Sequence, residues 1–284
     1  MANIRKIKRI LKSQPTIEGA GVHLKRAFGY QQLPDLDPFL LLDDFHSSNP
    51  DEYIKGFPWH PHRGIETITY VLYGKVEHGD SMGNKGIIFS GDIQWMTAGS
   101  GIVHQEMPKG QEDGLMWGFQ LWANLPASHK MMDPRYRDIK GQQVPEIVLD
   151  GGVKVKIICG EIEGTKGPVQ DIVIDPEYLD ISVPAKSRFK HPVKRGHKAF
   201  AYVIEGKGHF DQNREKMVDP ESLVIFDDGE EVVISTKDSG VRALFVSGKP
   251  IGEPVAWHGP IVMNTQEELR IAFEEYEKGT FIKS

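Results

Sequence analysis

The sequence is poor in cysteine and in long apolar runs. Its 284 residues include one cysteine, Cys159, so no disulfide can form within the chain, as is typical of proteins in a reducing compartment. No uninterrupted run approaches the roughly 20 apolar residues of a membrane span, and no apolar core of signal-peptide length follows the basic residues 1–14. We therefore expect a protein without membrane contact, located in the cytoplasm, or in the nucleus as well if the source is eukaryotic.

An excess of positive charge is also missing. The chain has 34 lysines and arginines against 40 aspartates and glutamates, which gives a net charge of −6. This balance disfavours a nucleic-acid-binding surface over the whole molecule. We expect no direct contact with nucleic acid.

Helical patterns are scarce, whereas turn-forming residues are abundant. The 30 glycines and 18 prolines make up about 17% of the 284 residues, more than the roughly 12% that these two residues usually contribute. Strand-like runs bounded by turn residues recur, for example residues 67–73 and 153–159. One strong helix is expected after Thr265, which forms a capping box with Glu268, and Gly279 is its expected end. These patterns predict an all-β protein with a short C-terminal helix.

The chain contains an internal repeat. Residues 70–75 (YVLYGK) match residues 202–207 (YVIEGK), at an offset of 132. Residues 96–99 (MTAG) align with residues 226–229 (FDDG), at an offset of 130. Because similar offsets recur across the length of a domain, we interpret the pattern as a duplication.

Two consecutive domains follow from this repeat. We predict an N-terminal domain over residues 1–140 and a C-terminal domain over residues 141–284, joined by a linker near residues 140–145. Since the two halves can pair with each other within one chain, we expect a monomer.

Three histidines and one glutamate have the spacing of metal ligands. His60 and His62 flank Pro61, which favours an extended backbone and so directs both imidazoles to the same face. His104 and Glu106 are again two residues apart and follow a glycine-rich turn. Two such strands facing each other inside a barrel would bring three imidazoles and one carboxylate together.

This set of side chains indicates the class of metal. Imidazole with one carboxylate suits Fe(II), Mn, Ni, Cu or Zn, whereas Ca and Mg prefer oxygen ligands alone. With three His and one Glu, an octahedral ion keeps two open positions, which a substrate oxygen and O₂ could use. Glu66, four residues after His62, is a rival ligand that ranks below Glu106 and could instead hydrogen-bond to a ligand.

The repeat indicates that only the N-terminal half holds a metal. At the repeat offsets, none of the counterparts of the four predicted ligands is a histidine or a carboxylate. They are Pro192, Lys194, Ile234 and Thr236. If both halves share one fold, the C-terminal half is therefore expected to be a structural or interaction domain without metal ligands.

The histidine motifs resemble those of the pirin family within the cupin superfamily. Gly56-x₃-His60-x-His62-x₃-Glu66-x₇-Gly74 resembles the first cupin motif, and residues 91–108 (GDIQWMTAGSGIVHQEMP) resemble the second in its pirin form. Residues 37–45, 120–126 and 259–268 resemble pirins as well. The resemblance implies two cupin barrels in one chain, with Fe(II) in the N-terminal barrel bound by His60, His62, His104 and Glu106. Mn, Ni, Cu, Zn and Co remain alternatives to iron.

The resemblance leaves two functions open. Some pirins resemble quercetin 2,3-dioxygenases, which implies a metal-dependent enzyme that cleaves flavonols such as quercetin with O₂ and releases CO. Glu106 would be its catalytic base, and a small flavonoid or phenolic with O₂ would be its substrates. Animal pirins are iron-dependent transcriptional co-regulators, which implies a binding module without turnover. A cupin enzyme acting on a different phenolic is a third alternative.

A flat aromatic substrate requires an apolar slot beside the metal. We expect Phe57 to form one wall, and Leu121 to be the central member of the inward-facing residues of its strand. Gln120 and Trp122 are then expected to face the other way. Asp43 is the remaining candidate for substrate binding, as a hydrogen-bond acceptor.

Overall fold

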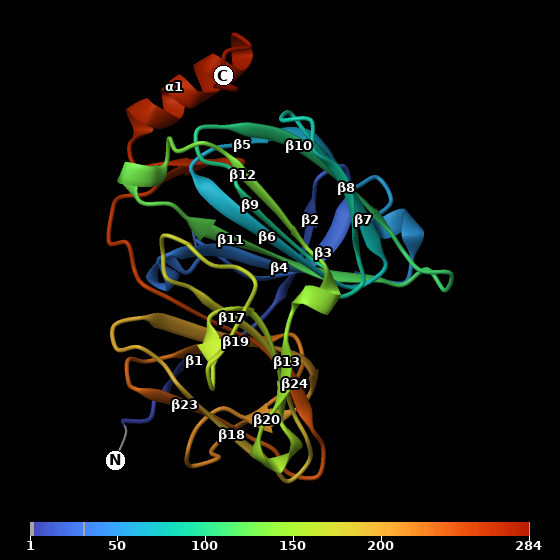
Figure 1. Ribbon diagram of the computed structural model, residues 1–284, viewed down its shortest axis with the longest axis vertical. Coiled ribbons are helices and arrows are strands. Elements are labelled where there is room, and N and C mark those ends of the chain that lie inside the picture. The colour runs from blue at the N-terminus through green and yellow to red at the C-terminus, as the bar shows by residue number, and fades with distance from the viewer. Residues whose placement is uncertain (1–2, 31, 284) are drawn as a thin grey trace. The chain divides into compact units, whose positions relative to one another are not determined.

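A computed structural model of the chain describes residues 3–30 and 32–283 (Figure 1). Within these ranges nearly all regular structure is β-strand, with one α-helix, α1 (Gln266–Glu277). The expectation of an all-β chain with a short C-terminal helix is therefore confirmed. Along the described ranges, no helix combines the length and the apolar character needed to cross a membrane.

The chain divides into two compact units, each built around its own pair of sheets. We call residues Pro15–Pro34, Phe39–Gln142 and Ile251–Ser284 the N-terminal barrel. We call residues Met1–Gln14, Asp35–Pro38 and Gln143–Pro250 the C-terminal barrel.

The N-terminal barrel is formed by a seven-stranded and a four-stranded antiparallel sheet. In spatial order the larger sheet contains β12 (Arg135–Ile139), β9 (Ile93–Thr97), β6 (Ile65–Tyr73), β11 (Met116–Asn124), β4 (Phe39–Ser47), β3 (Val22–Gly29) and β2 (Gln14–Glu18). The smaller sheet contains β5 (Phe57–His62), β10 (Ile102–Lys109), β7 (Lys75–Asp80) and β8 (Lys85–Phe89). A hairpin of β25 (Ala256–His258) and β26 (Ile261–Met263) precedes α1.

The C-terminal barrel has the same two kinds of sheet. Its larger sheet runs β1 (Ile7–Lys12), β22 (Ser222–Phe226), β19 (Lys198–Gly206), β24 (Val241–Gly248), β17 (Glu177–Val183), β14 (Lys154–Cys159) and β13 (Glu146–Val148). Its smaller sheet runs β18 (Arg188–Pro192), β23 (Glu231–Ser235), β20 (Gly208–His209) and β21 (Met217–Val218), and β15 (Glu161–Ile162) pairs with β16 (Thr165–Lys166). Short 3₁₀ turns in the chain are η1 (Pro34–Leu36), η2 (Pro50–Glu52), η3 (Ala127–His129), η4 (Gly141–Gln143) and η5 (Asp150–Gly152).

The two barrels share one strand order, which confirms the internal repeat. The central strands β9-β6-β11-β4-β3 of one larger sheet correspond to β22-β19-β24-β17-β14 of the other. The small sheets correspond strand for strand, so that β5 is the counterpart of β18 and β10 is the counterpart of β23. The repeated sequence at 70–75 and 202–207 falls at the same point, the ends of β6 and β19.

Each end of the chain belongs to the barrel that is formed mainly by the opposite half of the sequence. β1 pairs antiparallel with β22, with Leu11 opposite Leu223, so the first residues complete the C-terminal barrel. The red helix α1 and the hairpin before it belong to the N-terminal barrel, where Leu269 and Ala272 enter an apolar cluster with Ile261 (Figure 1). The expected contiguous halves, 1–140 and 141–284, therefore differ from these units at both ends, because strand pairing and helix packing outweigh sequence proximity.

The helix begins and ends where its sequence predicts. The Thr265 hydroxyl accepts a hydrogen bond from the backbone N–H of Glu268, and the Glu268 carboxylate accepts one from the backbone N–H of Thr265. Such a capping box pairs two backbone donors that the first helical turn leaves unpaired. Gly279, with φ of 71°, follows the last helical turn and has the left-handed backbone that favours glycine there.

Candidate metal centre and its cavity

Strand β5 presents two histidines to the barrel interior. Its sequence FPWHPH is extended, with Pro61 between the two imidazoles, and His62 is buried while His60 is half-buried. The histidine side chains therefore share one face of the strand, as the spacing predicts.

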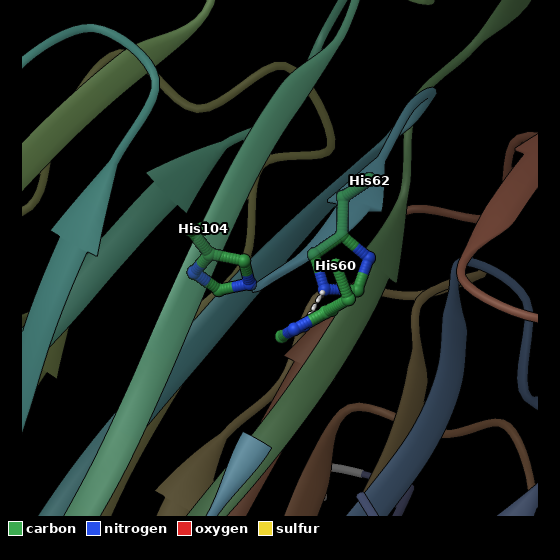
Figure 2. A group of neighbouring side chains, drawn as sticks. All are labelled: His60, His62 and His104. Atoms are coloured by element: carbon green, nitrogen blue, oxygen red, sulfur yellow. Dashed lines mark hydrogen bonds between the residues drawn. The ribbon is translucent and has the colours of Figure 1, made fainter. Parts of the chain in front are cut away.

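Strand β10 brings the third histidine to the same place. His104 lies directly opposite His60 in the antiparallel pairing of β10 with β5. The ring centroids lie 4.4 Å apart for His60 and His104, and 4.9 Å apart for His62 and His104. One potential ligand nitrogen from each ring lies within 4.8 Å of the others. The three rings converge from two neighbouring strands, as Figure 2 shows.

The hydrogen bonds of the rings leave lone pairs facing one another. His62 Nδ1 lies 2.9 Å from the carbonyl oxygen of Pro260, and His60 Nδ1 lies 2.8 Å from that of Pro58. Because a carbonyl only accepts, each Nδ1 is assigned the proton, and each Nε2 then carries a lone pair. The two Nε2 atoms lie only 3.1 Å apart. Two lone pairs at this distance repel each other unless a proton or a metal ion lies between them.

His104 gives the strongest indication that the cluster fits a metal ion. It is fully buried, at 0% exposure, and neither of its ring nitrogens has a hydrogen-bond partner among the described residues. Buried polar atoms are almost always paired. Burial, followed by the neighbouring histidines, holds the pKa values of His104 and His62 well below the usual value, so both rings are neutral near pH 7. Neutral imidazoles are the form that binds transition ions, so these residues fit such an ion.

Glu106 stands beside the histidines and is held by two side chains. The Thr69 hydroxyl donates to Glu106 Oε1 at 3.0 Å, and the Gln120 amide donates to Oε2 at 3.0 Å. The Gln120 oxygen in turn accepts from Trp122 Nε1 at 2.9 Å. The three-histidine cluster does not include Glu106 among the described residues. Its assignment as fourth ligand and as catalytic base therefore stays a prediction.

The rival ligand Glu66 is directed to a different neighbour. Its carboxylate accepts a hydrogen bond from the Thr97 hydroxyl at 2.7 Å. Glu66 differs by an odd number of residues from Thr69, whose hydroxyl meets Glu106, so it lies on the opposite face of β6. The structure does not bring Glu66 to the histidines.

The sequence analysis missed His78, a fourth histidine close to the cluster. It lies opposite Glu106 in the pairing of β7 with β10, and its ring centroid is 5.4 Å from that of His104. His78 Nε2 lies 3.5 Å from Asp80 Oδ2. The i and i+2 spacing of His78 and Asp80 matches that of the predicted ligand pairs and is the signal that could have revealed it.

A cavity of about 640 Å³ opens beside His60 and His62 within the N-terminal barrel. This size is in the range of pockets that take small organic ligands. Several aromatic residues contribute to its wall, and the polar ones include Gln120 and an ion pair of Arg26 with Asp43. The aromatic lining residues are Tyr30, Phe45, Phe57, Trp59, Trp122 and Trp257.

Two of the three predicted substrate residues line this cavity, and one does not. Phe57 and Asp43 are in the wall, although both Asp43 oxygens already accept from Arg26, at 2.8 and 2.7 Å. Leu121 is not among the lining residues, whereas Gln120 and Trp122 are, so the predicted orientation of this strand is wrong. Leu121 is only 1% exposed, which shows that both faces of β11 are buried. Apolar alternation cannot identify the inner face of such a strand.

The comparisons with known proteins match both halves of the chain. The family model described as Pirin matches residues 21–123, and the model described as Pirin C-terminal cupin domain matches residues 178–282. A quercetin 2,3-dioxygenase from Acinetobacter baumannii has a similar crystal structure, with a TM-score of 0.90, 30% identity and 98% of each chain covered. Fold and site thus define a two-domain cupin protein.

Two curated relatives extend over nearly the whole chain. A pirin-like protein of Caulobacter vibrioides is 45% identical and covers 98% of this chain and 99% of its own. A Pseudomonas aeruginosa protein, provisionally named a quercetin 2,3-dioxygenase, is 40% identical over the same shares of the two chains. The chain belongs to the pirin family, which confirms the resemblance stated from the sequence.

Proposed function

We propose that this protein is a metal-dependent dioxygenase that cleaves flavonols such as quercetin. The observation that carries the proposal is the cluster of three imidazoles, two of them buried, beside a cavity with aromatic side chains, with a carboxylate one hydrogen bond behind the cavity wall. The quercetin 2,3-dioxygenase names among the similar proteins support the same reaction class.

His60, His62 and His104, with Glu106 as the proposed fourth ligand, would hold one divalent transition ion, for which Fe(II) is our first choice. When bound, this ion would supply Lewis-acid and one-electron chemistry toward substrate and O₂. The protein shields two of these ligands from water, because His62 and His104 are buried.

Glu106 is suited to take up the proton of the flavonol 3-hydroxyl group. Its carboxylate is 3% exposed and is stabilised by donors from Thr69 and Gln120. Gln120 also lines the cavity, so it links the base to the bound substrate. The proton held on Glu106 returns to the product after the ring opens, which leaves the base ready for another turnover.

The aromatic wall is suited to a flat substrate. Trp122 lies edge-on to His62, with ring centroids 4.9 Å apart, and Trp257 follows at 5.9 Å from Trp122. Phe57 and Trp59 line the same cavity from the strand that carries His60. Aromatic surfaces in these orientations favour a planar polyphenol through stacking and edge contacts.

The reaction needs no external reductant. Two carbon–carbon bonds of the central flavonol ring break, both atoms of O₂ enter the ester product, and one ring carbon leaves as CO. The test is to incubate the iron-loaded protein with quercetin in air and to follow flavonol absorbance and CO release. We expect both to depend on the metal and to be lost in His62→Ala.

Quercetin loss no faster than that of His62→Ala would refute the dioxygenase. A protein that binds iron stoichiometrically under those conditions would instead favour the metal-bearing co-regulator that the pirin resemblance leaves open.

A further inference from the structure

His60 and His62 are oriented by different parts of the chain. The acceptor for His60 Nδ1 is the carbonyl of Pro58, two residues earlier on the same strand. The acceptor for His62 Nδ1 is the carbonyl of Pro260, 198 residues later, in the turn between β25 and β26. The orientation of one metal-ligand candidate thus depends on where the C-terminal segment lies.

Arg63 fastens this segment to both ligand-bearing strands. It directly follows His62, is 1% exposed, and donates from Nε to the carbonyl of Ser100 at 2.7 Å, in the turn before β10. Its other nitrogens meet the Phe281 carbonyl at 2.8 Å and the Glu275 carboxylate at 2.7 Å. The guanidinium also lies 4.2 Å from the centre of the Phe281 ring. One buried cation therefore connects the turns beside His62 and His104 with α1 and the residues after it.

A second buried basic side chain, Lys130, contacts the same junction. Lys130 Nζ donates to the carbonyls of Gly64 and Val262, at 2.9 and 3.0 Å, and to Asn124 Oδ1 at 2.7 Å. The backbones at Gly64 and Val262 approach so closely that a Cβ at Gly64 would lie 1.9 Å from the Val262 oxygen. The C-terminal segment is thus held in place by contacts that lie two residues from His62 on one side and two residues from Pro260 on the other.

We propose that the C-terminal segment, residues 256–283, is an orienting element of the metal centre. Through the Pro260 carbonyl it fixes the Nδ1-protonated form of His62 and the direction of its Nε2, and Glu275 and Phe281 are positioning residues that hold it there through Arg63. Hydrogen-bond partners of this kind behind a metal ligand contribute about 10- to 100-fold in metal affinity. The inference rests on the metal centre of the proposed function, and it does not require flavonol turnover.

The test compares neighbouring residues of α1. Glu275→Gln keeps the size of the side chain and removes the charge that faces Arg63. The matched control is Glu274→Gln, since Glu274 pairs with Arg270 and Lys278 on the exposed side of the helix. Phe281→Ala removes the ring beneath the guanidinium and is the stronger, second variant. Each protein is titrated with Ni(II) or Co(II) against a competing chelator, which gives affinity and release rate, and the Co(II) visible spectrum reports ligand geometry.

We expect Glu275→Gln and Phe281→Ala to bind about 10-fold more weakly, to release metal faster and to show an altered Co(II) spectrum, with Glu274→Gln unchanged. Wild-type affinity and spectrum in Glu275→Gln would overturn the inference while leaving the metal centre intact. If the wild-type protein takes up neither ion, the inference and the proposed metal centre fail together. Melting of the metal-free proteins serves as the check on folding: an equal loss of stability with and without metal, at unchanged affinity, would mean that the contacts are only structural.

Discussion

The two barrels share a scaffold and differ in what fills it. Along the small sheet, the N-terminal barrel pairs His60 with His104, whereas β18 and β23 of the C-terminal barrel pair buried Phe189 with Ile234. Across the larger sheet, Gln120 pairs with Thr69 and Asp43 in one barrel. At the corresponding positions of the other barrel, Phe245 pairs with Ala201 and Leu179. The duplication therefore preserved strand order and exchanged a polar interior for an apolar one.

The histidines of the two barrels show the same contrast. His191, on β18, is buried, and its Nε2 lies 2.8 Å from Glu177 Oε1 within the C-terminal barrel. His104 is equally buried, and its ring nitrogens have no partner among the described residues. A buried histidine that contacts a carboxylate has its hydrogen-bonding partner within the protein, whereas one without a hydrogen-bond partner is suited to bind a ligand.

Replacing each of these histidines with alanine should produce the largest difference between the two barrels, in metal binding. Binding of a transition ion contributes roughly 10–16 kcal/mol, shared among its ligands. His104→Ala removes one ligand and should therefore weaken metal binding by about 4 kcal/mol, or roughly 1,000-fold. His191→Ala should retain full metal content. Metal analysis after anaerobic loading measures both, and equal metal content in the two variants would remove the distinction between the barrels.

Placing an amide in the apolar barrel should cost nearly as much. Phe245 is fully buried in the C-terminal core, so Phe245→Gln loses ring packing and buries an amide without partners. We expect the free energy of unfolding to fall by about 3 kcal/mol. Phe89→Gln, at a residue that is 50% exposed, should change it by less than about 0.5 kcal/mol. Calorimetry of both variants would show whether the C-terminal core tolerates the polar interior of its counterpart.

The polar row of the N-terminal barrel should matter for rate rather than for metal. Gln120→Leu removes the donor to Glu106 and should lower kcat about 10- to 100-fold, with metal content retained. Gln32→Leu, in the same cavity wall, should leave kcat near the wild-type value. Steady-state kinetics with quercetin measure the effect, and a loss of metal from Gln120→Leu would assign the residue to metal retention instead.

The smallest effect, counted per pH unit, is the pH dependence of stability. Burial lowers the pKa of Lys130 from its ordinary value to about 7, so between about pH 7 and 10 the unfolded chain binds more protons than the folded one. Stability should therefore rise with pH across this window, by at most about 1.4 kcal/mol per pH unit, and should level off below pH 7. Lys130→Met should flatten this rise. Urea unfolding at several pH values provides the measurement. An identical dependence of stability on pH in the wild-type protein and in Lys130→Met would contradict the prediction.

Local spacing was sufficient to predict the strands that carry the histidines. Residues i and i+2 on an extended segment share one face, so the sequence alone places His60 and His62 together and His104 on an inward face. The inner face of β11 could not be predicted in this way, because Leu121 and Trp122 are both apolar and both buried. There the polar residues, Gln120 and Thr69, mark the interior.

No local sequence pattern predicts which distant segments complete each barrel. Pro260 and Trp257 reach the site only because residues 251–283 belong to the N-terminal barrel, and no periodicity within their own segment indicates this. The exchange of the first strand was equally hidden, since Leu11 meets Leu223 across more than 200 residues. Pairings between remote segments follow from the whole fold rather than from neighbouring residues.

This exchange of ends also sets the order in which the molecule can mature during translation. The barrel with the three histidines is encoded mostly before residue 142, yet its last pieces leave the ribosome only after the whole C-terminal barrel has been synthesised. The barrel whose residues are mostly synthesised first is thus finished last, and the nascent chain carries an incomplete histidine site until its final helix emerges.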